Sequence, residues 1–260
     1  MKPSKLDILS YLNMSEDARL SYGRLKELYD GVIWIEDKGT NTQGFALLDS
    51  DCNELVFAFR GSQQLQDWFN DFNAFHMVCP YGNTDSKIKI HRGFLECYKS
   101  VREQIHDIIK RHLRFYYIKA ILGTGHSLGG SLATLFCVDA QYNFESEILE
   151  NSKDCEEWRG VIGFTSGAPK VGNKQFCASF NKRIPNFTRT YHRRDWVPMC
   201  PPTAFGGVIH GGYHHVGNSN PLGTFNPFQG LQHWITSLRN PKDLISDLAS
   251  HSIDLYRECI

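Results

Sequence analysis

Long hydrophobic runs are missing from this sequence. No stretch reaches the roughly 18 apolar residues of a membrane-spanning helix. The first 20 residues begin with basic side chains but contain no apolar run of signal-peptide length. We therefore expect no transmembrane segment and a cytoplasmic protein, or a secreted one if the chain begins at a processed or engineered terminus.

Net charge is also absent. The 28 Lys and Arg residues balance the 28 Asp and Glu residues, and basic groupings such as residues 110–112 are short. A chain without an excess of positive charge has no field that attracts polyanions. The composition therefore argues against a nucleic-acid partner.

Cysteine pairs of the CxxC type are missing as well. The eight cysteines are scattered along the chain, which argues against a zinc site and against a redox motif. An even number permits disulfides, but a chain without an export signal is expected to keep its thiols reduced. We expect neither a metal nor a cofactor.

The sequence has no internal repeat, low-complexity tract or linker-like break, so we expect residues 1–260 to form one domain. Strand-like and helix-like segments alternate along it, which indicates an α/β fold with a central, mostly parallel sheet flanked by helices. The expected strands are 32–35, 45–48, 55–59, 116–122, 161–165 and 187–191, and the expected helices lie in 5–30, 94–113, 128–140 and 242–258. Residues 191–240 are expected to be mostly loop, with one short strand near 207–210.

A G-x-S-x-G motif, Gly125-His126-Ser127-Leu128-Gly129, lies between an expected strand and an expected helix. In such a nucleophile elbow the glycines let strand and helix approach closely while the turn projects the serine hydroxyl. The alternative is a phosphate-binding turn in which Ser127 caps the helix. The lysine of a P-loop is absent, so the context favours Ser127 as a nucleophile.

Further motifs give the chain a specific resemblance. With the elbow, they span residues 59–256, and they occur in the order of the class 3 lipases, the fungal-lipase-like group of α/β hydrolases. The segments that resemble that family are Phe59-Arg60-Gly61-Ser62, His91-Arg92-Gly93-Phe94, Gly167-Ala168-Pro169-Lys170-Val171-Gly172, Asp195-Trp196-Val197-Pro198, and His251 followed by Tyr256. The resemblance implies an α/β-hydrolase fold.

The acid and the base of a catalytic triad follow the serine in the chain order of α/β hydrolases. Asp195 comes after an expected strand and matches the acid position of the family. Five histidines follow it, and the resemblance selects His251 as the base. The alternative is that His251 lies on a surface helix and that His214 or His215 is the base.

The oxyanion formed during ester cleavage needs fixed donors. In this architecture they are the amide after the nucleophile, Leu128, and an amide from an earlier loop, which we assign to Ser62. The resemblance adds the Ser62 hydroxyl as a donor, whereas its alternative role is a helix cap.

An apolar stripe at helical spacing follows directly in residues 64–76. Such a stripe is usually core, but in class 3 lipases the matching region is a lid that turns its apolar face to lipid. Its members are Leu65, Trp68, Phe69, Phe72 and Phe75.

These residues predict a serine carboxylester hydrolase, in first place a lipase that acts on acylglycerol esters and touches a lipid interface transiently. A phospholipase or a feruloyl-type esterase on the same scaffold is the alternative, because pocket shape sets the substrate. An acyltransferase would share the acyl-enzyme intermediate. A lipase-like binding module without catalysis is the alternative from another class.

Overall fold

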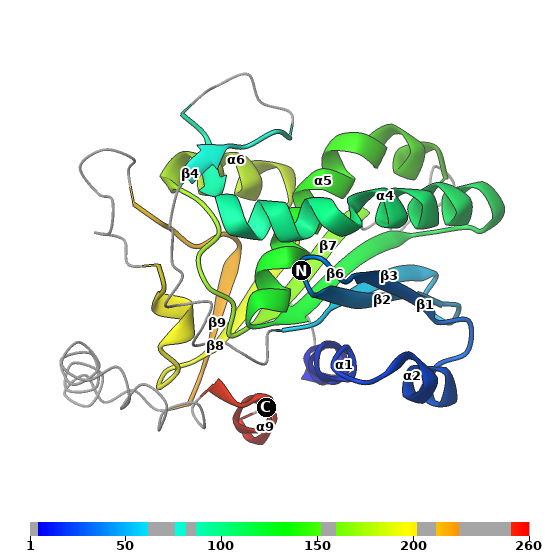
Figure 1. Ribbon diagram of the computed structural model, residues 1–260, viewed down its shortest axis with the longest axis horizontal. Coiled ribbons are helices and arrows are strands. Elements are labelled where there is room, and N and C mark those ends of the chain that lie inside the picture. Colours follow the sequence, from blue (N-terminus) through cyan, green and yellow to red (C-terminus); the bar gives the residue numbers. More distant parts are fainter. Residues whose placement is uncertain are drawn as a thin grey trace.

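A mixed β-sheet forms the centre of the molecule (Figure 1). The computed structural model describes residues 5–61, 76–81, 87–151, 160–201, 212–223 and 251–259, and within them the sheet has the strand order β1-β2-β3-β6-β7-β8-β9. The strands from β1 to β3 are antiparallel, and those from β3 to β9 are parallel. Their bounds are β1 Ile33–Asp37, β2 Thr42–Asp49, β3 Glu54–Phe59, β6 Ala120–His126, β7 Gly160–Ser166, β8 Phe187–His192 and β9 Asn218–Leu222.

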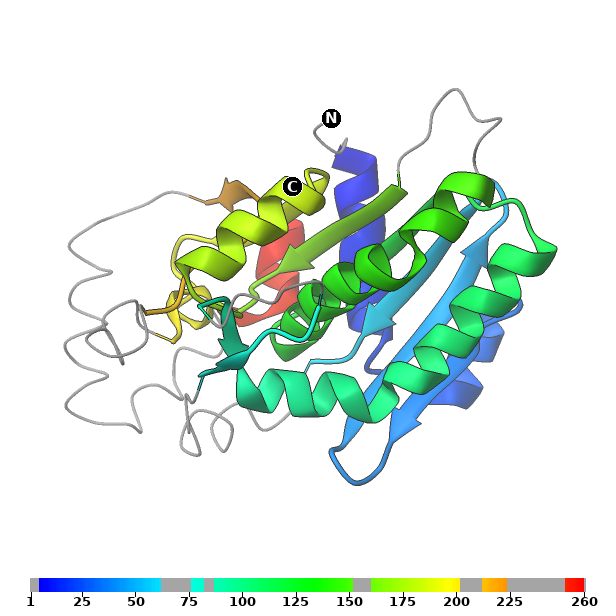
Figure 2. The same cartoon turned by 90° about the horizontal axis from the view of Figure 1, so that it is seen from above.

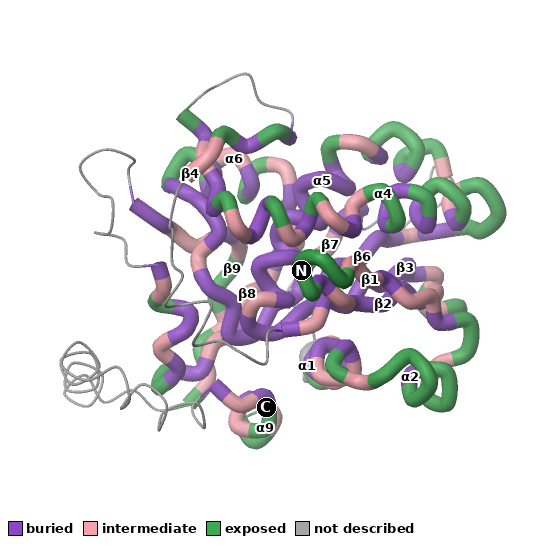
Figure 3. The backbone as a smooth tube through the Cα atoms, in the orientation of Figure 1, coloured by how far each residue is buried: buried purple, intermediate pink, exposed green. Residues whose placement is uncertain are grey.

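Both faces of this sheet are buried. All six residues of β3 are buried, and because successive side chains of a strand point to opposite faces, they contribute to two separate cores. Leu55, Phe57 and Phe59 belong to one core, whereas Val56 and Ala58 belong to the other. Figure 3 shows the resulting buried centre between exposed outer helices. The continuous apolar run of β3 is therefore typical of a central strand covered on both sides.

Three helices cover one face of the sheet (Figures 1 and 2). They are α4 (Arg92–Phe115), α5 (Leu128–Asn151) and α6 (Lys174–Arg183). The helix α4 buries one apolar stripe and exposes its charges, whereas α5 is buried along most of its length. None of the described helices has the length and apolar composition needed to span a bilayer.

The other face is covered by α1 (Lys5–Asp17), α2 (Tyr22–Leu28) and α9 (Ile253–Glu258) (Figure 1). Leu12 of α1 shares a small core with Ile253 and Tyr256 of α9. The Arg257 side chain donates from Nε and Nη2 to Asn13 Oδ1, at 3.0 and 2.8 Å. The segments near the two ends of the chain are thus packed against each other.

A two-stranded ribbon of β4 (His76–Val78) and β5 (Lys89–His91) precedes α4. The imidazole of His91 caps that helix, because its Nδ1 accepts the amide hydrogen of Phe94 at 3.3 Å. A short 3-10 turn, η1 (Val197–Met199), follows β8.

A buried carboxylate joins the helices α4 and α5. Asp139 of α5 is fully buried and accepts hydrogen bonds from Tyr98, at 2.6 Å, and from Arg102 Nε, at 3.1 and 3.2 Å. It also contacts His106 Nε2 at 2.7 Å and Asn143 Nδ2 at 2.7 Å. The charge of Asp139 is therefore compensated by partners on both helices.

The structure differs from the sequence expectations at several boundaries. The strand expected at 116–122 begins at Ala120, because Tyr116 is the C-cap of α4. The helix α5 continues eleven residues beyond the expected 140, to Asn151. Neither α6 nor β9 was expected. The expected strand near 207–210 and the expected helix before residue 251 lie outside the described residues.

Candidate active site

Ser127 occupies a sharp turn between β6 and α5. Its φ of 59° lies in the left-handed region, which a residue with a Cβ rarely adopts. A Cβ placed on Gly125 would lie 2.3 Å from the carbonyl carbon of Gly129, and one on Gly129 would lie 2.1 Å from the carbonyl oxygen of Phe59. Both motif glycines are therefore required by close backbone contact. The geometry is that of a nucleophile elbow.

Asp195 lies just after β8, at the edge where the parallel strands end, and is buried. Its Oδ1 accepts the amide hydrogen of Val197 at 2.9 Å. Its Oδ2 contacts Nδ1 of His251 at 2.7 Å and accepts the hydroxyl hydrogen of Tyr256 at 2.5 Å. Sequence positions 195, 251 and 256 thus meet in one buried group.

The contact with Asp195 determines which ring nitrogen of His251 carries a hydrogen. A carboxylate only accepts hydrogen bonds, so Nδ1 of His251 carries a hydrogen, and in the neutral ring Nε2 then has a lone pair. Nε2 of His251 and Oγ of Ser127 are both buried, and neither has a hydrogen-bond partner within the part of the chain that the structure describes. The hydrogen bond between Ser127 and His251 is therefore not formed in this structure. Such contacts commonly tighten only when substrate binds.

Tyr256 is held as a hydrogen-bond donor. Burial, and after it the charge of Asp195, raise the pKa of the Tyr256 hydroxyl well above its usual value. The hydroxyl therefore keeps its hydrogen at neutral pH. The sequence motif included Tyr256, but its contact with Asp195 became visible only in three dimensions.

The two alternative histidines make other contacts. Nε2 of His215 lies 2.5 Å from the carbonyl oxygen of Pro198, and burial lowers the pKa of His215 to about 3. His214 donates its backbone amide to the carbonyl of Gly172 at 2.8 Å. Among the described residues, the imidazole on Asp195 is that of His251.

The expected oxyanion residues are only partly described. Leu128 is the first residue of α5, and the amides of a first helical turn have no partner within the helix and carry partial positive charge. Ser62 lies outside the described residues, although Gly61 is within them. A Cβ on Gly61 would lie 3.4 Å from the Cβ of Ser127, so the chain reaches the elbow immediately before Ser62.

Residues 64–75 of the candidate lid also lie outside the described residues, whereas His76 begins β4. Leu65, Trp68, Phe69 and Phe72 are all among the residues outside. Within the described residues, no group of three His, Cys, Asp or Glu side chains is arranged to bind a metal ion.

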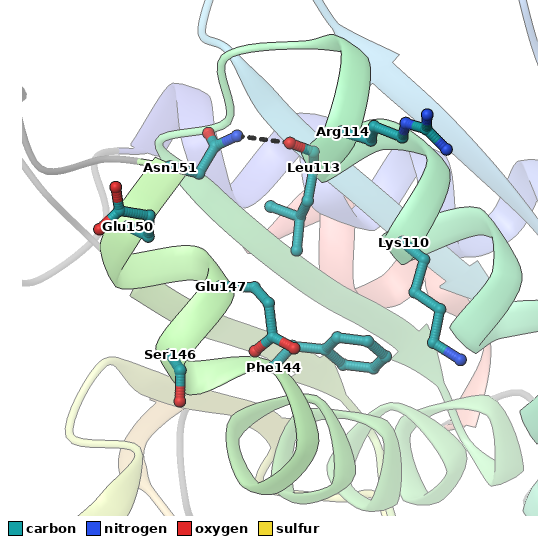
Figure 4. A pocket seen from close by; sticks show the side chains of 8 residues that line it. All are labelled: Lys110, Leu113, Arg114, Phe144, Ser146, Glu147, Glu150 and Asn151. Atoms are coloured by element: carbon teal, nitrogen blue, oxygen red, sulfur yellow. Dashed lines mark hydrogen bonds between the residues drawn. The ribbon is translucent and has the colours of Figure 1, made fainter.

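A hollow of about 460 Å³ lies at the far end of α5, between that helix and the end of α4 (Figure 4). It is open to solvent and mixes the charges of Lys110 and Arg114 with those of Glu147 and Glu150. At about 1.5 Å of rise per helical residue, Glu147 is roughly 30 Å from Ser127. The hollow is therefore not part of the candidate active site.

Comparison with known proteins gives a consistent result. The family model described as Lipase (class 3) matches residues 56–205. A lipase of Rhizopus niveus is 30% identical over 66% of this chain and 41% of its own length. The phospholipase A1-IIgamma of Arabidopsis thaliana is 29% identical over 71% of this chain and 45% of its own. The chain thus spans less than half the length of these two relatives.

Solved structures agree with the sheet topology. The crystal structure of a lipase from Rhizopus microsporus var. chinensis superposes with a TM-score of 0.67 and 25% identity, covering 87% of this chain and 78% of that one. The expected α/β-hydrolase fold is confirmed.

Proposed function

The chain belongs to the lipase (class 3) family, and on that premise we propose that it is a serine carboxylester hydrolase, in first place a lipase of acylglycerols. The observation that carries the proposal is a buried serine in a left-handed elbow, whose neighbour His126 contacts the histidine of a buried aspartate–histidine pair. A serine hydroxyl needs a neighbouring base to become a nucleophile, and this arrangement provides one.

In the proposed reaction, Ser127 Oγ attacks the ester carbonyl while its proton passes to Nε2 of His251. Asp195 holds the ring in the required tautomer and stabilises the imidazolium that forms. The oxyanion is bound by the amides of Leu128 and Ser62. The C–O bond of the ester then breaks, and the leaving alcohol takes the proton from His251. A water molecule, activated by the same imidazole, finally releases the acyl group as a carboxylic acid.

A phospholipase is the second candidate, and the similarity to the Arabidopsis thaliana phospholipase A1-IIgamma favours it specifically. The feruloyl-type esterase, the acyltransferase and the binding module have no such observation in their favour. The elbow chemistry is common to all of the enzymes, so substrate choice depends on the pocket.

A substrate panel tests these proposals. Triacylglycerol emulsion, phosphatidylcholine vesicles and p-nitrophenyl esters are offered to the wild type and to the Ser127→Ala variant. A lipase hydrolyses the emulsion fastest, and the variant loses about four to six orders of magnitude of turnover. Faster release of fatty acid from the phospholipid would assign a phospholipase. Equal turnover by wild type and variant would remove Ser127 as the nucleophile.

We also propose that residues 64–76 act as a lid and contact a lipid surface transiently. The support is the apolar stripe in the sequence. Replacing Trp68 and Phe72 with Ser should impair hydrolysis of emulsified long-chain esters much more than that of short soluble esters. Equal losses on both substrates would assign the stripe to ordinary core.

Two further proposals concern the domain organisation of the chain and its location in the cell. Residues 1–260 form one domain, which predicts a single cooperative unfolding transition by two independent probes. The protein is cytoplasmic, which fits free thiols at Cys79, Cys97, Cys137, Cys177, Cys200 and Cys259. Cell fractionation tests the location.

A further inference from the structure

The residue before the candidate nucleophile, His126, touches the candidate base. His126 is the last residue of β6 and is buried. Its Nε2 lies 2.9 Å from the backbone carbonyl oxygen of His251, and its Nδ1 lies 3.0 Å from Oγ of Ser166. The two imidazoles also face each other, with ring centres 4.6 Å apart and planes inclined by 31°.

These contacts define the hydrogen positions on His126. A backbone carbonyl only accepts, so Nε2 of His126 carries a hydrogen and donates it to His251. In the neutral ring Nδ1 is then an acceptor, and it accepts the hydroxyl hydrogen of Ser166. Burial, followed by the neighbouring His251 and then Arg19, holds the pKa of His126 well below its usual value. His126 therefore stays neutral, so it does not compete with His251 for the proton of Ser127.

The carbonyl contact holds a part of His251 that the carboxylate does not reach. Asp195 fixes the ring at Nδ1, whereas His126 fixes the backbone of the same residue. This bond joins the backbone of the candidate base to the side chain of His126, the residue that precedes the nucleophile in the chain.

The space around these groups is tightly filled. A Cβ placed on Gly167 would lie 2.9 Å from Cε1 of His126, 3.0 Å from Oδ2 of Asp195 and 3.0 Å from Cε1 of His251. The side chains of His126, Asp195 and His251 therefore all lie against Gly167. A misplacement of about 1 Å in an active site can lower the rate about a hundredfold.

We propose that His126 is a positioning residue that places Nε2 of His251 for the proton of Ser127, an inference that rests on the proposed hydrolase function. The competing explanation is that His126 only fills the core. The two explanations differ in what they require of the side chain: positioning requires a donor at the location of Nε2, whereas filling requires only volume.

Two amide variants separate these requirements. In His126→Gln the amide nitrogen lies near the former Nε2 and can still donate to the carbonyl of His251. In His126→Asn the shorter side chain ends near the former Nδ1, so it retains the contact with Ser166 and loses the one with His251. Both variants remain polar and neutral, and thermal unfolding shows whether each is folded at the assay temperature.

Positioning predicts that kcat of His126→Asn falls about a hundredfold with KM little changed, while His126→Gln stays within about tenfold of wild type. The loss in His126→Asn should be the same across the pH profile of kcat/KM, because a neutral donor moves the base without changing its charge. Equal kcat values for the two variants, or losses that follow only their melting temperatures, would overturn the inference.

Nitrogen-15 NMR of the histidine side chains supplies a test that needs no turnover. The expected spectrum of the wild type contains a neutral His126 with hydrogen on Nε2. Both variants remove the neighbouring ring, so the His251 ring signals shift in each, but the shift is clearly larger in His126→Asn than in His126→Gln. Hydrogen on Nδ1 of His126, or His251 signals that are alike in both variants, would refute the inference even if the chain hydrolyses esters. An inactive wild type with the expected NMR result would instead refute the proposed function alone.

Discussion

The left-handed conformation of Ser127 predicts an unusual order of stability among variants. Replacing Ser127 with Ala removes the hydroxyl but keeps a Cβ at a φ of 59°, whereas replacing it with Gly removes the Cβ as well. Both variants should lack turnover. The Gly variant should nevertheless gain, relative to the Ala variant, the free energy that the left-handed region costs a residue with a side chain.

The magnitude follows from a comparison with Ser131, a buried residue in the first turn of α5, where the backbone is already right-handed helix. Gly destabilises a helix interior by about 0.8 to 1.0 kcal/mol relative to Ala, through chain entropy and lost burial. The same terms act at Ser127, but there the relief of the left-handed conformation adds about 1 to 2 kcal/mol in favour of Gly. The Gly-minus-Ala difference in unfolding free energy should therefore be about 1 to 2 kcal/mol more favourable at position 127 than at 131.

Urea unfolding of the Gly and Ala variants at positions 127 and 131, at 25 °C, measures the two Gly-minus-Ala differences. The wild type provides the reference value for the slope of unfolding free energy against urea concentration. The ester assay on the same samples separates stability from catalysis. Equal Gly-minus-Ala differences at the two positions would refute the claim that the elbow stores backbone strain.

Three other perturbations have definite expected outcomes. Tyr256→Phe removes a donor to the Asp195 carboxylate and should lower the free energy of unfolding at pH 7 by about 1.5 to 3 kcal/mol, measured by urea titration. Burial and, after it, the nearby His76 lower the pKa of His91 from 6.5 to about 4, while Glu96 acts in the opposite direction. Because His91 binds a proton more tightly in the unfolded chain than in the folded one, the free energy of unfolding falls on acidification. Integrated from pH 7 to pH 5, this difference lowers the free energy of unfolding by about 2 kcal/mol. The contribution should be absent in His91→Asn. Asp139→Asn should cost about 3 kcal/mol of stability with kcat unchanged at temperatures where the variant is folded.

Each of these expectations has a control. Tyr98→Phe removes a buried hydroxyl that donates to the other buried carboxylate, Asp139, so it should lower the free energy of unfolding by a similar amount, and no loss in Tyr256→Phe beside a clear loss in Tyr98→Phe would contradict the role given to Tyr256. In His91→Asn the Asn oxygen can still cap α4, so an unchanged pH dependence of stability would show that another group is responsible. A large fall in kcat for Asp139→Asn would contradict the separation of its network from the candidate site.

The central strands and covering helices were predictable because their apolar patterns are long and regular. The continuous apolar run of β3 and the single apolar stripe of α4 each fit only one type of element. The elements that the sequence did not predict have weaker patterns. β9 contains Asn, Ser and Pro and is largely exposed, so its position depends on pairing with β8 and not on local preference.

The candidate site was predictable to a different extent for each residue. The G-x-S-x-G pattern is local, and it located Ser127 because the close packing of its glycines is encoded within five residues. The pairing of Asp195 with His251 joins positions 56 residues apart, and the sequence suggested it only through family resemblance. The bond from His126 to a backbone carbonyl leaves no compositional signal, since any residue at position 251 has that carbonyl.

Identification of the residue that a fluorophosphonate modifies is the most direct test of Ser127 as the nucleophile. A serine activated by His251 predicts one adduct, located by mass spectrometry on Ser127, formed rapidly by the wild type and at a greatly reduced rate by His251→Ala. An adduct on another residue would contradict the assignment of this site. So would ester hydrolysis that persists at full rate after complete modification of Ser127.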